Sequence, residues 1–189
     1  MDRPTYVVLA AGLSTRMGFD KAIAPLAGYS PLERVVRALG DRSLIIVVPT
    51  RLVSAVVAIA PDTRIVCNDQ AERGMTHSLQ LALAFVARGA CFGVVPADMP
   101  AMTEATIART ESILRDGIDV AYPVRADGRG GHPVLFAPTM RGLVEKLPEG
   151  DTLRRARDAA PVRATWFCSD PSAFLDLDEP SEWEGFMDT

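Results

Sequence analysis

A polar loop over residues 12–21 holds the first residues whose types and spacing could do chemistry. It follows an apolar run typical of a fully buried strand, and its glycines, Gly12 and Gly18, let a ligand approach the main chain closely. Arg16 and Lys21 place two positive charges beside this loop. In open α/β proteins, loops that leave buried strands at the sheet edge hold phosphate groups. The stretch therefore predicts a nucleoside triphosphate site.

Neither of the common glycine fingerprints matches this loop. A Walker loop would end in glycine, lysine and serine or threonine, whereas a dinucleotide fingerprint would have glycines closer together than Gly12 and Gly18, which are six residues apart. A strand-to-helix turn with solvated charges is therefore the alternative interpretation of the loop.

Asp98 and His132 are two further candidates for chemistry. Asp98 follows a buried strand expected over residues 91–95, and the carboxyl ends of such strands are where open α/β sheets bind ligands. His132 follows a turn rich in glycine and charge, and the last glycines of that turn allow tight backbone approach to a substrate. A structural role is the alternative for a lone histidine of this kind.

Alternating strands and helices are predicted to position these residues. Apolar, β-branched runs predict strands, and amphipathic segments between them predict helices. Besides the strand before the loop, strands are expected over residues 43–48, 63–67, 91–95, 120–124, 132–136 and 162–167. Helices are expected over residues 31–39, 52–60, 103–114, 139–147 and 152–159, from about residue 76, and near the C-terminal end. This alternation predicts an α/β fold with a doubly wound sheet.

Two of the helices have recognisable start signals. Ser30, Pro31 and Glu33 match an N-cap, a proline at the first helical position and a capping-box acid, and Gly40 is expected to end that helix. The other helix is expected to start near Thr76, either with Thr76 simply as its N-cap or with free amides that face a ligand.

This second helix also carries a predicted buried stripe. Met75, Leu79, Leu83 and Val86 follow one another at spacings of four and three residues, which places them on one helix face. His77 is expected to be a solvated residue of the same helix.

Composition limits the class of protein. With 189 residues, 48% of them hydrophobic and 23% charged, the chain is expected to form one globular domain over residues 1–189. A net charge of -4 argues against a nucleic-acid partner. No segment is typical of a membrane span or a cleaved signal peptide, and three scattered cysteines are expected to be reduced core thiols. The sequence thus predicts a cytoplasmic protein with no membrane partner.

Several motifs together resemble the MobA-like nucleotidyltransferase family, and within it the molybdopterin cytidylyltransferases. The first motif is specific to the superfamily, and the ordered set favours the cytidylyltransferase branch over sugar-phosphate enzymes. In chain order the motifs are Leu9 to Gly18 with Lys21, Pro25-Leu26 and Gly28; Asn68; Gly74-Met75 and Ser78; Asp98-Met99-Pro100; Gly131-His132-Pro133; and Asp176-Leu177-Asp178 before Pro180.

The resemblance implies a three-layer α/β/α Rossmann-like nucleotidyltransferase fold with a mostly parallel mixed sheet. It also implies roles for individual residues. Arg16, Lys21 and Asp98 are expected to be catalytic, with Arg16 and Lys21 holding the triphosphate, and His132 is expected to bind the acceptor substrate. The positions that match nucleotide-binding residues of the family are Leu9, Ala10, Ala11, Gly12, Leu13, Lys21, Asn68, Gly74 and Ser78.

Mg²⁺ is the cofactor that the resemblance implies. Asp98 matches the metal-binding aspartate of the family, and Asp178 is the better match for a second ligand, although Asp176 could do the same work or be a surface acid. Mg²⁺ prefers oxygen ligands and keeps several waters, so one or two aspartates and phosphate oxygens suffice to bind it. The transfer itself requires positioning and charge neutralisation more than a protein nucleophile.

The resemblance also suggests the two substrates. Ala11 goes with cytosine in this family, where glycine goes with guanine, so CTP is the expected nucleotide and molybdopterin the expected acceptor, with a molybdenum enzyme as recipient of the product. Departures from the family pattern at Ala97, Glu179 and residues 150–152 concern mostly the acceptor. Alternatives are transfer to a sugar phosphate or another small phosphorylated acceptor, a glycosyltransferase, and a non-catalytic module that binds a nucleotide or cofactor during maturation of molybdenum enzymes.

Overall fold

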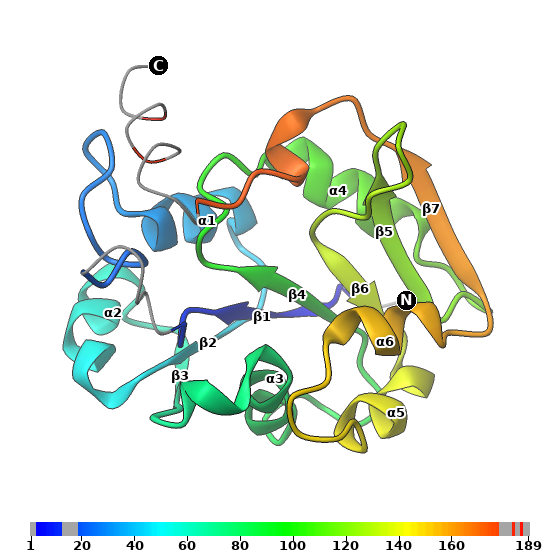
Figure 1. Cartoon of the computed structure of the whole chain (residues 1–189), viewed down its shortest axis with the longest axis horizontal. Coiled ribbons are helices and arrows are strands. Elements are labelled where there is room, and N and C mark those ends of the chain that lie inside the picture. The colour runs from blue at the N-terminus through cyan, green and yellow to red at the C-terminus, as the bar shows by residue number, and fades with distance from the viewer. Residues whose placement is uncertain (1–2, 13–18, 178–182, 184–185, 187–189) are drawn as a thin grey trace.

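A seven-stranded sheet forms the centre of the protein, as described by a computed structural model of residues 3–12, 19–177, 183 and 186 (Figure 1). The strands are β1 (Thr5–Leu9), β2 (Leu44–Val48), β3 (Arg64–Cys67), β4 (Phe92–Pro96), β5 (Val120–Val124), β6 (Val134–Phe136) and β7 (Arg163–Phe167). The α-helices are α1 (Pro31–Leu39), α2 (Val53–Ile59), α3 (Met75–Leu83), α4 (Glu104–Ile113), α5 (Arg141–Glu145) and α6 (Leu153–Asp158).

The sheet is mixed but mostly parallel. Its strand order is β3-β2-β1-β4-β6-β5-β7. All neighbouring pairs are parallel except those of β6, which runs antiparallel to both β4 and β5. This arrangement confirms the mostly parallel mixed sheet that the sequence predicts.

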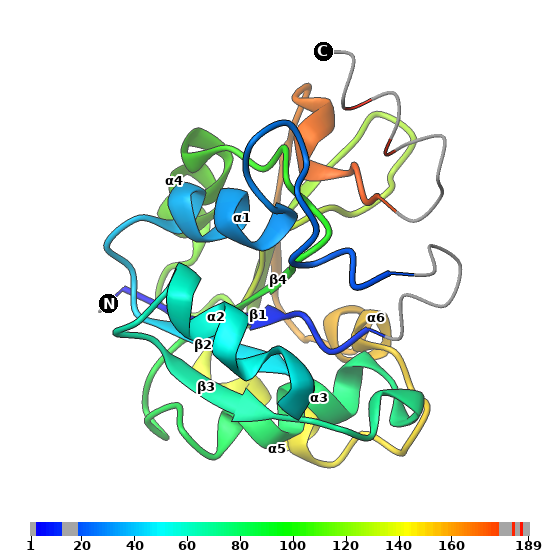
Figure 2. The ribbon, with the colours of Figure 1, turned by 90° about the vertical axis from the view of Figure 1, so that its left-hand side faces the viewer.

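Helices cover both faces of the sheet and complete a three-layer architecture (Figures 1 and 2). Side chains alternate between the faces of a strand, so on β1 Tyr6 and Val8 belong to one apolar cluster while Val7 and Leu9 belong to another. The first cluster includes buried residues of α1, α2 and α4, and the second includes those of α3, α5 and α6. The predicted α/β/α fold is therefore confirmed.

The start and end of α1 follow from local sequence alone. Ser30 Oγ accepts a hydrogen bond from the Glu33 amide, and the Ser30 amide donates to Glu33 Oε2 at 2.6 Å, which completes the capping box. Pro31 is the first helical residue, and Gly40, with a φ of 60°, ends the helix. The prediction for residues 31–39 is confirmed at both ends.

The predicted start of α3 near Thr76 is confirmed, but Thr76 as its N-cap, one of the two interpretations, and the burial of Met75 are not. The helix starts at Met75 with Gly74 as its N-cap, so Thr76 is not a cap; its hydroxyl instead donates to the Asp151 carbonyl at 2.5 Å. Met75 is 48% exposed, in contrast to the fully buried Leu79 and Leu83. Met75 is the first residue of the helix, and its side chain lines cavities at the surface rather than packing in the core.

One cysteine also departs from expectation. Cys91 and Cys168 are buried thiols, but Cys67 is exposed because it ends the edge strand β3, which has a neighbour on one side only. Across the described part of the chain, the helices are too short or too polar to span a bilayer.

Candidate active site

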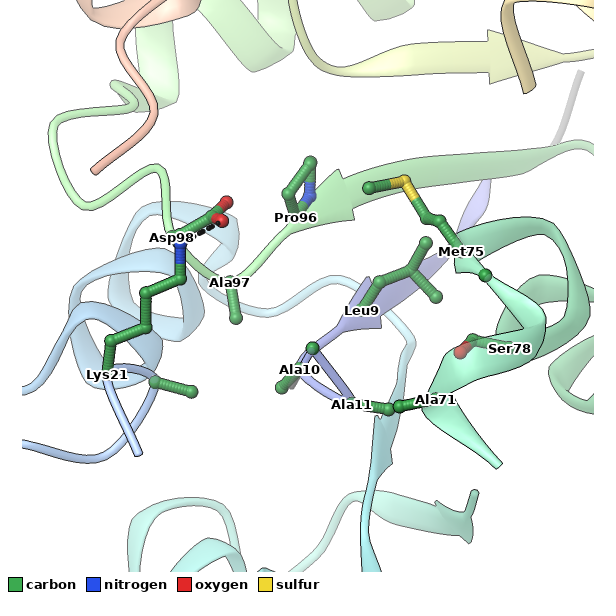
Figure 3. Close-up of a pocket in the computed structure, with 13 residues that line it drawn as sticks. Leu9, Ala10, Ala11, Lys21, Ala71, Met75, Ser78, Pro96, Ala97 and Asp98 are labelled. Atoms are coloured by element: carbon green, nitrogen blue, oxygen red, sulfur yellow. Dashed lines mark ion pairs between the residues drawn. The ribbon is translucent and has the colours of Figure 1, made fainter. Parts of the chain in front are cut away.

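A cavity of about 220 Å³ opens at the carboxyl ends of β1 and β4 (Figure 3). Leu9 and Pro96 are register partners at these ends, and the Ala97 amide donates to the Leu9 carbonyl at 3.0 Å. The loops that follow the two strands therefore begin at the same edge of the sheet, where open α/β sheets bind ligands. The cavity is lined by Leu9, Ala10, Ala11, Gly12, Lys21, Ala22, Ala71, Gly74, Met75, Ser78, Pro96, Ala97 and Asp98.

Three segments that are distant in sequence meet at one side of this cavity. Lys21 Nζ lies 3.0 Å from Asp98 Oδ2 and also donates to the Leu177 carbonyl at 3.0 Å. The Leu177 amide in turn donates to the Asp98 carbonyl at 3.0 Å. These contacts fix the lysine and the aspartate at the cavity and bring the C-terminal segment beside them.

The second carboxylate oxygen of Asp98 has no such partner. Asp98 Oδ1 is buried and makes no hydrogen bond within the described ranges. An unsatisfied buried oxygen is rare in native proteins and points to an unfilled binding role. A carboxylate oxygen of this kind fits a Mg²⁺ ion, which takes one or two protein carboxylates and completes its shell with water and phosphate oxygens.

The described residues contain no cluster of three or more His, Cys, Asp and Glu side chains that could hold a metal by themselves. A metal at Asp98 would therefore need oxygen ligands from a bound phosphate, from water or from a residue outside this range. Asp178 lies outside the described residues, as do Leu13 and Arg16. Asp176 Oδ1 lies 3.7 Å from Arg129 Nη2.

The opposite wall of the cavity is formed by the start of α3. Gly74, with a φ of 88°, turns the chain into the helix, and no side chain caps the first turn. Ser78 lines the cavity, whereas Asn68 lies behind it: Asn68 Nδ2 donates to Ser78 Oγ at 2.8 Å, and Asn68 Oδ1 accepts from the Gln70 amide at 2.9 Å. Asn68 thus positions Ser78 rather than lining the cavity.

A second cavity, of about 430 Å³, adjoins the first and shares Gly74 and Met75 with it. The exposed Met75 therefore stands at the boundary between them. The second cavity is lined by Gly74, Met75, Val94, Gly130, Gly131, His132, Val134, Phe136, Gly150, Asp151, Thr152, Leu153, Arg154 and Arg157. Two adjoining cavities can hold a nucleotide and a separate acceptor.

His132 lies in the second cavity with a defined tautomer. Its Nδ1 is 3.2 Å from the Val94 carbonyl, which can only accept, so Nδ1 carries the proton and Nε2 is left as an acceptor. Burial lowers the pKa of His132, and the charge of Arg157 lowers it further, against the opposing effects of the Val94 hydrogen bond and nearby carboxylates. His132 is accordingly a neutral acceptor near pH 7.

Gly131 is required by the packing around His132. A side chain at Gly131 would overlap the Ala173 carbonyl and the Phe174 ring, while the His132 amide donates to that same carbonyl at 2.9 Å. The glycine next to His132 therefore lets the C-terminal segment approach closely and fixes the backbone that carries the imidazole.

Two kinds of residue at these cavities are missed by reasoning from the sequence. The sequence assigns Met75 to the core because it precedes Leu79 by four residues and so shares its helix face. This periodicity does not show which turn of the helix packs on the sheet and which turn lines a cavity. Arg154 and Arg157 line the second cavity, and their separation by three residues on a predicted helix was the available signal, since such residues share one helix face.

Comparisons with known proteins agree with a nucleotide-binding α/β domain. A family model described as "MobA-like NTP transferase domain" matches residues 6–164. The chain is 33% identical over 152 residues to bifunctional protein GlmU of Chromobacterium violaceum, an alignment that covers 78% of this chain. It is 35% identical over 170 residues to 2-C-methyl-D-erythritol 4-phosphate cytidylyltransferase of Saccharopolyspora erythraea, which covers 84% of this chain.

These two relatives are longer proteins, of which the chain spans 32% and 66% of the length, respectively. Among solved structures, Rv0371c of Mycobacterium tuberculosis H37Rv in complex with manganese superposes over the whole of both chains, with a TM-score of 0.78 and 27% sequence identity.

Proposed function

The chain belongs to the family of MobA-like NTP transferase domains, and from this premise we propose that it is a nucleotidyltransferase that transfers CMP from CTP to molybdopterin. Pyrophosphate is the second product, Mg²⁺ is the cofactor, and a molybdenum enzyme receives the dinucleotide. The observation that supports this proposal most is the pair of Lys21 and Asp98 at the carboxyl ends of β1 and β4, in which one carboxylate oxygen has no hydrogen-bond partner among the described residues.

The reaction needs no nucleophile from the protein. A phosphate oxygen of the acceptor attacks the α-phosphorus of CTP, the bond between the α-phosphorus and its bridging oxygen breaks, and pyrophosphate leaves with both electrons of that bond. Such transfers depend on positioning and on neutralising charge. Asp98, with Asp178 as the proposed second ligand, would hold Mg²⁺, which would supply charge neutralisation on the phosphate oxygens.

Lys21 and Arg16 stabilise the negative charge that develops on the leaving pyrophosphate. Lys21 is held beside the cavity by Asp98 Oδ2 and the Leu177 carbonyl, so its ammonium group is already in position before the triphosphate enters. Preorganised charge of this kind is worth more than a flexible surface lysine, because no free energy is needed to orient it during the reaction.

Cytosine is the proposed base because of Ala11. The Ala11 side chain is buried at the cavity wall, and its methyl group leaves less room for a purine than a glycine would. The relative from S. erythraea, at 35% identity, is named as a cytidylyltransferase, which also favours CTP. Its name includes a small phosphorylated acceptor, so methylerythritol 4-phosphate is the second candidate acceptor.

The test measures pyrophosphate release from purified protein with Mg²⁺ and each of CTP, GTP, UTP and ATP. Each nucleotide is supplied with molybdopterin, with methylerythritol 4-phosphate, and alone. Release with CTP that depends on molybdopterin supports the proposal, whereas dependence on methylerythritol 4-phosphate identifies the second acceptor. Tight nucleotide binding without release under any condition contradicts catalysis by this chain.

A matched variant tests the role of Ala11. Ala11→Gly is expected to use GTP better relative to CTP, since it removes the methyl group at the cavity wall. Ala60→Gly is the control, because Ala60 is likewise a buried alanine but lines neither cavity. An unchanged ratio of kcat/KM for the two nucleotides in Ala11→Gly would exclude this explanation of the base preference.

A further inference from the structure

The guanidinium of Arg157 lines the second cavity with its two terminal nitrogens available to a ligand. It lies on α6, its side chain is only 16% exposed, and its Nε donates to Asp158 Oδ1 at 3.0 Å. Its two terminal nitrogens make no hydrogen bond to any part of the chain that the structure describes. A buried guanidinium with free donors is suited to bidentate recognition of a phosphate.

On this basis we infer that Arg157 binds the phosphate group of the acceptor, and that Tyr122 and Gly130 hold its guanidinium in place for this purpose. The inference rests on the proposed function, in which the acceptor's phosphate attacks CTP. It adds the residue that selects a phosphorylated acceptor and the two residues that position it.

Tyr122 fixes the plane of the guanidinium. The Arg157 Cζ lies 4.7 Å from the centroid of the Tyr122 ring, and Tyr122 is buried on β5. Stacking on an aromatic ring orients a guanidinium while leaving the donors at its edge available. The guanidinium therefore lines the cavity while its terminal N–H groups make no hydrogen bond to the described residues.

Gly130 provides the space for this arrangement. A side chain at this position would overlap Arg157 Nη1 and would come within 3.1 Å of Tyr122 Cε2. The backbone of Gly130 is not in the left-handed region and pairs with Val124, so an alanine could adopt its conformation. A side chain at this position would therefore have to displace the guanidinium, whereas the turn itself does not require a glycine.

The charge around the cavity favours an anion. Arg154 and Arg157 both line it, and the carboxylate of Asp151 is already engaged by Arg155 at 2.6 Å. His132 lines the same cavity as Arg157. A phosphate held by Arg157 would accordingly lie in the second cavity, on the acceptor side of the site.

The first experiment measures phosphate binding without any assumption about the acceptor. Inorganic phosphate is titrated calorimetrically into protein that is saturated with Mg²⁺ and a non-hydrolysable CTP analogue, so that the triphosphate site is filled. We expect Arg157→Gln to weaken phosphate binding tenfold or more and Arg157→Lys to weaken it less. Arg88→Gln, which removes an exposed arginine that lines neither cavity, controls for net charge and should have no effect.

The second experiment separates positioning from general damage. Gly130→Ala is expected to weaken phosphate binding severalfold in the wild-type background and to add almost nothing to Arg157→Gln, because its effect acts through the guanidinium. Tyr122→Leu should weaken binding, while Tyr122→Phe, which keeps the ring, should not. Thermal unfolding of each variant verifies that it is folded.

The third measurement uses turnover with CTP and molybdopterin. Arg157→Gln should lower kcat/KM for molybdopterin tenfold or more and leave KM for CTP within twofold. If molybdopterin is not a substrate but phosphate binding still depends on Arg157, the proposed acceptor is wrong and the inference stands. Wild-type phosphate affinity in Arg157→Gln, or additive effects of Gly130→Ala and Arg157→Gln, would overturn the inference.

Discussion

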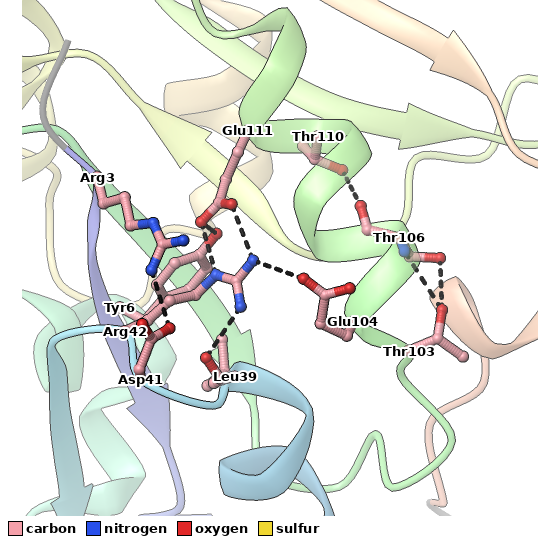
Figure 4. Close-up of polar contacts among 10 residues, drawn as sticks. All are labelled: Arg3, Tyr6, Leu39, Asp41, Arg42, Thr103, Glu104, Thr106, Thr110 and Glu111. Atoms are coloured by element: carbon pink, nitrogen blue, oxygen red, sulfur yellow. Dashed lines mark hydrogen bonds and ion pairs between the residues drawn. The ribbon is translucent and has the colours of Figure 1, made fainter.

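Two ion pairs at opposite ends of β1 differ in how completely their polar atoms are satisfied. At the amino end, Arg42 is nearly enclosed and donates to both oxygens of Glu111 at 2.8 and 2.9 Å, to Glu104 at 3.1 Å and to the Leu39 carbonyl at 3.0 Å (Figure 4). Tyr6 adds a hydrogen bond to Glu111 at 2.8 Å. At the carboxyl end, the pair of Lys21 and Asp98 leaves one buried oxygen of Asp98 without a hydrogen-bond partner in the part of the chain that the structure describes.

The titration of the amino-end network reflects its complete pairing. Burial alone would raise the pKa of Glu111, but hydrogen bonds from Arg42 and Tyr6 lower it below its ordinary value. Burial and the negative charge of Glu111 raise the pKa of Tyr6. The network therefore keeps its charges fixed through the neutral pH range.

The difference separates a structural role from a functional one. The amino-end network ties β1, α1 and α4 together, and none of its buried side-chain nitrogens and oxygens lacks a hydrogen-bond partner. A pair with an unsatisfied oxygen beside a cavity can still bind a ligand, at some cost to stability. Substitutions in the two regions should consequently affect different measurements.

Among these substitutions, Asp98→Asn is expected to have the largest effect. It should lower activity and leave stability almost unchanged. Turnover should fall on the order of a hundredfold or more, because a preorganised charge is lost. The free energy of unfolding should change by less than about 1 kcal/mol, since the pair is partly exposed and one oxygen has no partner to lose. Pyrophosphate release measures turnover and thermal unfolding measures stability, both on the same preparation. Near-normal turnover would contradict a catalytic role for Asp98.

Glu111→Ala should show the opposite pattern. Removing this carboxylate leaves Arg42 buried without its main partner, which is expected to destabilise the protein by about 3 kcal/mol in chemical denaturation. The variant should keep near-normal kcat where it is folded. Glu104→Ala is the control: Glu104 is 64% exposed and shares one contact with Arg42, so its loss should cost less than about 1 kcal/mol.

The pH dependence of unfolding sharpens the same comparison. Because the pKa of Glu111 is lower in the folded protein than its ordinary value of 4.5, the unfolded chain binds more protons as the pH falls through this range. The stabilisation from Glu111 is therefore present above about pH 4.5 and is lost as the pH falls through the folded value. The difference in unfolding free energy between wild type and Glu111→Ala should shrink below pH 4.5; a constant difference would show that the lowered pKa does not contribute.

Tyr6→Phe tests the smallest part of the network. It removes one hydrogen bond to a carboxylate and should cost about 1.5 kcal/mol without changing turnover. Tyr122→Phe is a matched comparison, because within the described residues the Tyr122 hydroxyl has no hydrogen bond, and a change below about 0.5 kcal/mol is expected. Equal losses in both variants would mean that the ring environment, and not the bond to Glu111, decides stability.

Local signals in the sequence predict much of the fold. The capping box and Gly40 define α1, and the alternation of apolar runs predicts the sheet, because these features depend on residues close together in the chain. The sequence also predicts a site at the ends of β1 and β4, because Lys21 ends the polar loop after the first predicted strand and Asp98 follows another predicted strand.

Long-range packing explains what the sequence does not predict. Tyr6 and Glu111 are 105 residues apart, and Tyr122, Gly130 and Arg157 come from three separate elements. No spacing rule brings such residues together, because their contact depends on how sheet and helices pack. The exposure of Met75 has the same origin: its helical periodicity matches the core, and only the packing of α3 shows that its first residue lines the cavities.

Asp98 Oδ1, which has no hydrogen-bond partner within the described residues, is the proposed metal ligand of the nucleotide site. Electron paramagnetic resonance of Mn²⁺ can measure metal binding at saturating CTP in the wild type and in Asp98→Asn, with CTP affinity measured separately in the absence of metal. We predict that Asp98→Asn weakens Mn²⁺ binding tenfold or more while metal-free CTP affinity is retained. Equal Mn²⁺ affinity in the two proteins would contradict the assignment of Asp98.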